Sequence, residues 1–149
     1  MTIAIATVTD SISQIDIAGV QICDIDEIRT AVTDRDCPVL MPEPLNFMGN
    51  IVIVADAFGP ASTRKRTITY TLNYTFLYCP VGQGRELERY GDMVEKAFAI
   101  LDGLILEDDL TGSIAMNPVA VTEFGPVPDP AGNQFLGCRF QLQVQEFIN

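Results

Sequence analysis

The segment that most constrains the fold of this chain runs from Arg64 to Pro80, with the sequence RKRTITYTLNYTFLYCP. From Thr67 to Phe76, bulky apolar and aromatic residues alternate with small polar ones. The apolar set, which Tyr78 extends, is Ile68, Tyr70, Leu72, Tyr74 and Phe76. Alternation with a period of two is typical of a long β-strand that buries one face. We therefore predict that this strand forms the centre of a sheet.

Three further segments have the composition of strands. The run IVIVADA, from Ile51 to Ala57, is apolar on both faces, so we predict a strand that is central or covered. Residues 113–124 and 135–148 are predicted to be two long closing strands, joined by GPVPDPAGN as a rigid exposed hairpin tip. The polar face of the last strand, Gln141 to Gln145, is either plain solvent-facing surface or part of a wet subunit interface.

Two segments are predicted to be helices. Residues 2–16 form an opening helix that stops before Gly19. Residues 85–102 carry apolar side chains at three- and four-residue steps opposite a charged side, which is the pattern of an amphipathic helix. We expect its apolar stripe to cover the aromatic face of the central strand. The predicted stripe is Leu87, Tyr90, Val94, Phe98 and Leu101, widened by Met93, Ala97 and Ile100.

Residues 20–50 have a less regular pattern. Val20 and Ile22 indicate a short strand or turn, and the three prolines of CPVLMPEP impose extended or turn conformations on residues 37–44. We predict that this proline-rich segment crosses the surface or follows the sheet edge. The expected fold class is α+β, with a mixed, mainly antiparallel β-sheet and two helices packed on one face. The length favours a single domain over residues 1–149.

The chain is acidic, with nine Lys and Arg against twenty Asp and Glu and a formal charge of −11. This balance argues against specific binding to DNA, whose phosphates need neutralisation. An acidic surface serves either solubility or a position close to nucleic acid without adhesion to it. No apolar run approaches the ~20 residues of a membrane span, and the N-terminal residues lack the basic start of a signal peptide. A cytoplasmic origin is therefore expected.

The sequence contains no arrangement typical of an active site. It has no histidine, which excludes Ser/His/Asp and Cys/His nucleophilic catalysis. The turn at 81–84 lacks the third glycine and the Lys-Ser/Thr ending of a phosphate loop. Two acidic groups, at 24–27 and 107–109, lack the spacing of a calcium loop. Four scattered cysteines favour buried thiols over a zinc site; they are Cys23, Cys37, Cys79 and Cys138. We therefore predict a non-enzymatic protein without a metal or cofactor.

The order of these elements resembles that of the tail terminator, or tail-completion, proteins of tailed bacteriophages. The likeness covers most of the chain. It depends on CPVLMPEP at 37–44, the long strand at 66–79 followed directly by the helix at 85–102, and the closing pair that ends FQLQVQEF at 140–147. The resemblance implies a mixed sheet with helices on one face and no catalytic motif.

The resemblance also implies a function. Proteins of this family assemble as a homohexameric ring that caps the tail tube, stops its polymerisation and presents a surface to the head connector. The implied partners are further copies of the chain, the major tail tube protein and a head–tail connector or neck protein. The genome would pass through an acidic lumen without specific binding. The implied location is the virion, after assembly in the host cytoplasm.

Two charged segments are the candidates for contacts between subunits or with the tube. Arg64, Lys65 and Arg66 form the one dense basic patch of the sequence, and the acidic loop at 107–109 carries the opposite charge. Three bases at a hairpin end are either a solvated turn or a docking contact. The acidic residues are Glu107, Asp108 and Asp109.

Three alternatives to a tail terminator stay open. Neck and head–tail joining proteins have a similar layout, so a neck adaptor ring is the first. A small-ligand-binding domain or enzyme that uses an acidic pocket is the second, and it is motivated by the abundance of carboxylates. The third is an adaptor of a bacterial contractile injection machine, which differs from the tail terminator in genomic setting.

Overall fold

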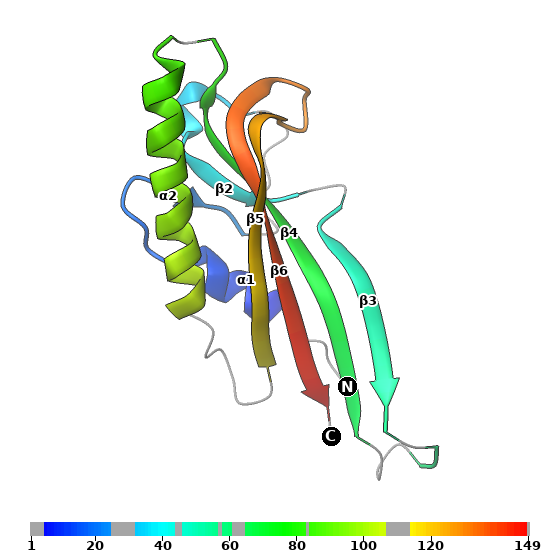
Figure 1. Ribbon diagram of the computed structural model, residues 1–149. Helices are drawn as coiled ribbons and strands as arrows, with labels where there is room; N and C mark the ends of the chain where they lie inside the picture. The colour runs from blue at the N-terminus through cyan, green and yellow to red at the C-terminus, as the bar shows by residue number, and fades with distance from the viewer. Residues whose placement is uncertain are drawn as a thin grey trace.

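The computed structural model describes residues 5–24, 32–43, 46–56, 58–60, 65–82, 84–106 and 114–148. Within them, six strands form one sheet and two α-helices lie on the same face of it (Figure 1). This confirms the predicted α+β class. In chain order the elements are α1 (Ile5–Ser13), β1 (Gln21–Ile22), the short 3₁₀ helix η2 (Asp34–Asp36), β2 (Val39–Pro42), β3 (Met48–Ala55), β4 (Arg66–Pro80), α2 (Glu86–Leu106), β5 (Ile114–Pro128) and β6 (Gln134–Ile148).

β4 is the central strand, as its alternation predicts. The strand order is β1-β2-β4-β6-β5, and β3 also pairs with β4. β6 follows one edge of β4 over its whole length in antiparallel register, from Arg66 opposite Ile148 to Pro80 opposite Phe135. On the other edge, β3 and β2 pair with successive parts of β4. β1 is parallel to β2, and every other pair of strands is antiparallel.

The main core lies between the sheet and the two helices. The apolar side chains that alternate along β4 from Ile68 to Phe76 are buried. The rings of Phe76 and of Phe140 on β6 pack edge to face, with their centroids 6.5 Å apart. Removal of this apolar surface from water is the main source of stability. On the opposite, polar face, Gln141 and Gln143 are exposed. The helical contributions to the core are Val8 and Ile12 of α1, and Met93, Ala97, Ile100 and Leu104 of α2.

A second, smaller core covers the other face of the sheet at one end. Because of it, β4 is buried on both faces from Thr75 to Leu77. The predicted exposed tip at 125–133 is therefore wrong in part, since β5 continues to Pro128 and the hairpin curls over the sheet (Figure 1). The cluster consists of Cys23, Val32, Val39, Met41, Leu77, Val127 and Phe135.

The proline-rich segment is also more buried than predicted. Val39–Pro42 forms β2, which is buried throughout and lies between β1 and β4 instead of crossing the surface. The reason is that Pro38 and Pro42 stand at the ends of an apolar strand, where proline is tolerated.

Candidate interaction surfaces

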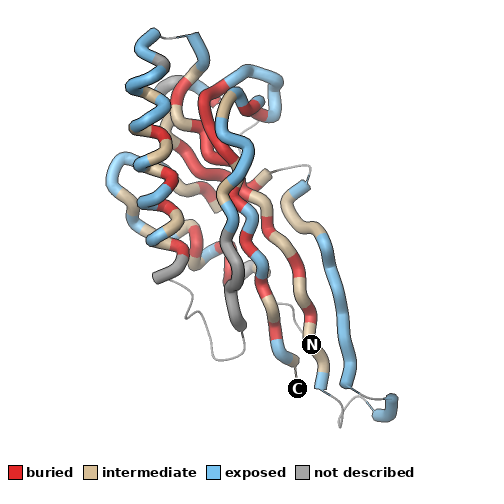
Figure 2. Tube along the Cα trace, viewed as in Figure 1, coloured by how far each residue is buried: buried red, intermediate tan, exposed pale blue. Residues whose placement is uncertain are grey.

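The strand predicted at 51–57 is present as β3 (Met48–Ala55), but its predicted position is wrong. The run Ile51–Val54 was expected to be central or covered, but the four side chains are 53 to 71 % exposed. β3 pairs with β4 along one edge, and among the described residues its other edge has no partner strand. Figure 2 shows β3, after its first two residues, as a continuous exposed band beside β4. We refer to Ile51–Val54 as the β3 ribbon.

The two edges of the sheet differ in how they are protected. Edge strands normally carry charges, prolines or bulges that prevent pairing with another chain. β5 has two register shifts, and its prolines are Pro118, Pro126 and Pro128. β3 has one shift, between Gly49 and Val52, and is regular from Val52 to Ala55 without a charge or a proline. The β3 edge is therefore apolar and open to pairing.

The helix α2 agrees with its prediction only in part. Its buried face is centred on Met93, Ala97, Ile100 and Leu104. The centre of the predicted stripe is turned outward, since Leu87 is 89 % and Phe98 61 % exposed. One cause of this rotation is a hydrogen bond from the Tyr78 hydroxyl to the Asp92 carboxylate. Asp92 lies on the side of the buried face that is farther from Phe98, so the bond draws that side of the helix toward the sheet. Burial and this carboxylate raise the pKa of Tyr78 to about 12, so the phenol stays a donor.

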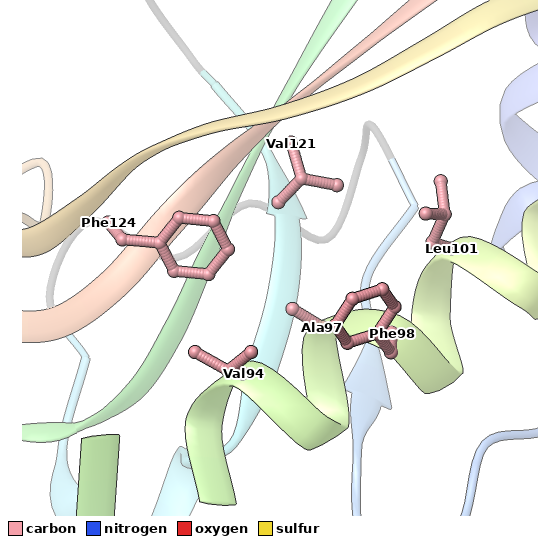
Figure 3. Close-up of a pocket in the computed structure, with 6 residues that line it drawn as sticks. All are labelled: Val94, Ala97, Phe98, Leu101, Val121 and Phe124. Atoms are coloured by element: carbon pink, nitrogen blue, oxygen red, sulfur yellow. The ribbon is translucent and has the colours of Figure 1, made fainter. Parts of the chain in front are cut away.

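The outward flank of α2 forms an apolar groove with β5. The groove has a volume of about 260 Å³, and each side chain that lines it is apolar (Figure 3). Such a surface accommodates apolar side chains of a partner and has no group for acid–base chemistry. We call it the α2–β5 groove. Its lining residues are Val94, Ala97, Phe98, Leu101, Val121 and Phe124.

A row of carboxylates runs beside this groove on α2. Glu88, Glu95 and Asp102 recur every seven residues, so they lie on one side of the helix, and all three are exposed. Among the described residues none of the three forms an ion pair. The last turn of α2 has no basic residue, so the negative end of its dipole is uncompensated there. We call Glu88, Glu95 and Asp102 the acidic row.

Two of the six predicted contact residues lie where β3 and β4 meet. Lys65 is exposed and Arg66 is the first, half-buried residue of β4. The Lys65 amide donates to the Asp56 carboxylate at 2.8 Å, and the Asp56 amide donates to the Lys65 carbonyl at 3.0 Å. We call the paired part of β3 and β4, from Met48 opposite Leu72 to Ala55 opposite Arg66, the β3–β4 arm. The two hydrogen bonds place Lys65 and Arg66 at its end. The other four residues lie outside the described residues: Arg64, Glu107, Asp108 and Asp109.

The alternative of a ligand-binding acidic pocket would use a polar hollow of about 190 Å³, which is lined by Glu43 and Asp129 among others. Its carboxylates already have partners. Asp129 accepts hydrogen bonds from the amides of Val32, Ala131 and Asn133 at 2.8 to 3.0 Å, and Glu43 pairs with Arg139 at 3.2 Å. Burial tends to raise the pKa of Asp129, but these hydrogen bonds outweigh it and hold the pKa below its ordinary value. The carboxylates of this hollow therefore hold neighbouring segments of the chain together and are not available to bind a ligand.

The remaining candidate groups do not assemble into a site. In the described part of the chain, no three His, Cys, Asp or Glu side chains are placed to hold a metal ion. Cys23, Cys79 and Cys138 are buried, Cys37 is half-buried, and none forms a disulfide. Burial raises the pKa of Cys138 to about 12, which makes its thiol unreactive. Of the acidic group at 24–27, Asp24 is half-buried, and Asp26 and Glu27 lie outside the described residues.

Two observations complete the description of the chain. No helix among the described residues is long and apolar enough to cross a membrane. Comparison with protein-family models and with curated proteins finds no match. The fold thus defines an α+β protein on a mainly antiparallel sheet, with an apolar surface at each of two opposite edges.

Proposed function

We propose that this chain is a structural subunit of a tailed-phage virion. It forms a ring at the head-proximal end of the tail tube, ends tube polymerisation and offers the surface for head joining. The observation that carries this proposal is the β3 ribbon, four consecutive exposed aliphatic residues on an unprotected strand edge. A surface of this kind marks a site for another protein chain. The element order on which the resemblance to tail terminators depends supports the phage setting.

The charge of the chain agrees with this function. With a formal charge of −11, a ring of such subunits repels the phosphates of DNA that passes through its lumen and so suppresses adhesion. The partners are further copies of the chain, the tail tube protein and a connector or neck protein. The function requires no catalytic step, metal or cofactor.

The same surfaces suit a neck adaptor ring, which is the second candidate. It differs in position along the particle, between the head and the end of the tail. The alternative of an acidic ligand pocket has less support, since Asp129 and Glu43 line the polar hollow and both are engaged in contacts within the chain.

Deletion of the gene from a phage that carries it tests the proposal. Electron microscopy of the lysate is expected to show tails of excessive and variable length without heads, and the wild-type gene supplied in trans is expected to restore normal particles. Tails of normal length that stay unjoined to heads would favour the neck adaptor. Normal, infectious particles without the gene would refute both structural functions.

A further inference from the structure

We propose that the β3 ribbon of one copy docks into the α2–β5 groove of the next copy, so that subunits join head to tail. This inference rests on the proposed function, because a ring of identical subunits is its starting point. It adds the two surfaces that meet and their orientation.

The position of the two surfaces favours head-to-tail contact. The β3 ribbon lies at one edge of the sheet, and β5, which lines the α2–β5 groove together with α2, lies at the other (Figure 1). Contact between two different surfaces of one subunit is heterologous, and repetition of such a contact closes a ring when the rotation between neighbours divides a full turn evenly. A single type of contact then covers both apolar surfaces. Pairing of β3 with β3 about a two-fold axis would leave the groove exposed.

The chemistry of the two surfaces also matches. Met48–Ala55 contains no charged residue, and the groove is lined by apolar side chains, including the rings of Phe98 and Phe124 (Figure 3). The register shifts and prolines of β5 disfavour extension of the sheet across the contact. The ribbon therefore docks through its side chains and not through backbone pairing with β5.

Charge sets the orientation of the docked copies. Lys65 and Arg66 lie just beyond the β3 ribbon, at the end toward which β3 runs. α2 runs toward the same end of the molecule (Figure 1), so its negative C-terminal end and Asp102 lie on that side of the groove. Neighbours in a ring share one orientation. The basic end of the arm therefore comes to lie next to the acidic end of the neighbour's helix, which is the favourable arrangement.

The strand register gives the tilt of the subunits. Ile53 of the ribbon pairs with Ile68 of β4, which pairs with Glu146 of β6. Val121 of the groove pairs with Phe140 of β6, six residues away from Glu146. Six residues correspond to about 20 Å along the strand. A closed ring has no net rise, so the strands must be inclined to the ring axis. Three strand spacings of about 4.8 Å separate β3 from β5, and the docked ribbon adds a packing distance of about 10 Å, so the step from one subunit to the next is about 25 Å. An offset of about 20 Å over this step corresponds to an inclination of roughly 40°.

Two variants separate the surfaces. Ile53→Asp places a charge on the ribbon, and Phe98→Asp places one in the groove; both positions are exposed, so the fold of the subunit is retained. Matched controls are Gln143→Asp on the open sheet face and Ala99→Asp on the exposed side of α2. Circular dichroism and thermal unfolding verify the fold of each, and sedimentation velocity and native mass spectrometry measure assembly.

The expected result has three parts. The wild type and both controls form rings as concentration rises. Each variant alone stays monomeric at concentrations at least tenfold above the wild-type midpoint. An equimolar mixture of Ile53→Asp and Phe98→Asp forms one-to-one dimers and nothing larger, because only one intact ribbon and one intact groove remain per pair.

Two results would overturn the inference. Ring or dimer formation by Phe98→Asp alone would show that the groove is not the partner of the ribbon. A wild type that stays monomeric but binds purified tail tubes would assign the ribbon to the tube protein. Either result leaves the proposed function standing if gene deletion alters tail length. Normal tails after deletion, together with the mixing result, would refute the function and keep the interface.

Discussion

At the scale of single residues, contacts between β4 and β6 account for features that alternation does not show. Glu146 lies on the apolar face of β6 and is buried, which is costly for a carboxylate. The Tyr70 hydroxyl donates a hydrogen bond to it at 2.6 Å and offsets part of that cost. At the other end of the pair, Gly137 faces Leu77 at an irregular step in β4, where the backbones approach closely.

A methyl group at Gly137 is expected to destabilise the protein. A Cβ atom there would collide with the Phe76 carbonyl oxygen, which belongs to a buried strand and has no room to move. Gly137→Ala should lower the free energy of unfolding by about 2–4 kcal/mol, measured by urea denaturation. The control is Gly91→Ala, at an exposed position of α2 with open space around it, which should raise that energy by about 0.5–1 kcal/mol. Equal effects of the two substitutions would contradict the close approach.

Asp129 is expected to make stability depend on pH under acidic conditions. Its native pKa lies below the ordinary value of 3.8, so the ionised carboxylate adds stability above pH 3.8 that is lost as the pH falls through the native pKa. At neutral pH, Asp129→Asn should cost about 1–3 kcal/mol, because amide hydrogen bonds to a charged acceptor are weakened. The difference from the wild type should shrink below pH 3.8, as followed by urea denaturation. A difference that stays constant with pH would argue against this role. Asp102→Asn, at an exposed carboxylate, serves as the control.

At the scale of elements, the sequence predicts which face of a strand is buried where the two faces differ, and fails to predict burial where they do not. β4 and β6 alternate between apolar and polar, and that pattern defines their buried face. The run at Ile51–Val54 is apolar on both faces, which is equally the pattern of a buried strand and of an edge strand that binds another chain. The buried face of α2 is predicted only in part for a related reason: Met93, Ala97 and Ile100 are buried as expected, whereas Leu87 and Phe98 of the same predicted stripe are exposed. The apolar residues of α2 cover more of the helix surface than the core can bury. Periodicity therefore does not predict that Ile100 is buried and Phe98 exposed.

The orientation of α2 is tested by a pair of truncations. Ile100 is fully buried, so Ile100→Ala should lower the free energy of unfolding by about 2–5 kcal/mol. Leu87, in the stripe that the sequence favoured, is 89 % exposed, and Leu87→Ala should change that energy by less than about 0.5 kcal/mol. Chemical denaturation of the monomer measures both. A larger cost at Leu87 than at Ile100 would mean that α2 packs with its Leu87 side inward.

At the scale of the whole molecule, an acidic protein carries two residues of its dense basic patch, Lys65 and Arg66, at the end of an apolar arm. Net charge of one sign makes copies of the chain repel each other at long range. Local attraction must overcome that repulsion before the apolar surfaces meet. Lys65 and Arg66 at the end of the arm, and the acidic row beside the groove, supply opposite charges at the two edges of one subunit. Charge thus selects the pairing of opposite edges over the pairing of like edges.

Charge reversal tests this selection. Lys65→Glu and Asp102→Lys should each weaken assembly about two- to fivefold at low salt, since an exposed pair contributes about 0.5–1 kcal/mol. If the two side chains meet across the contact, the double variant recovers most of the loss, because the pair is restored with its signs exchanged. Sedimentation velocity at several salt concentrations provides the measurement, and the differences should fade toward about 1 M salt, where screening acts within about 3 Å. Glu123→Lys, at the exposed carboxylate that pairs with Arg139 within the chain, is the control: it changes the net charge as much as Asp102→Lys does, and Lys65→Glu should still weaken assembly when combined with it. If Lys65→Glu loses its effect in the Glu123→Lys background as well, net charge governs assembly and the assigned contact between arm and helix is wrong.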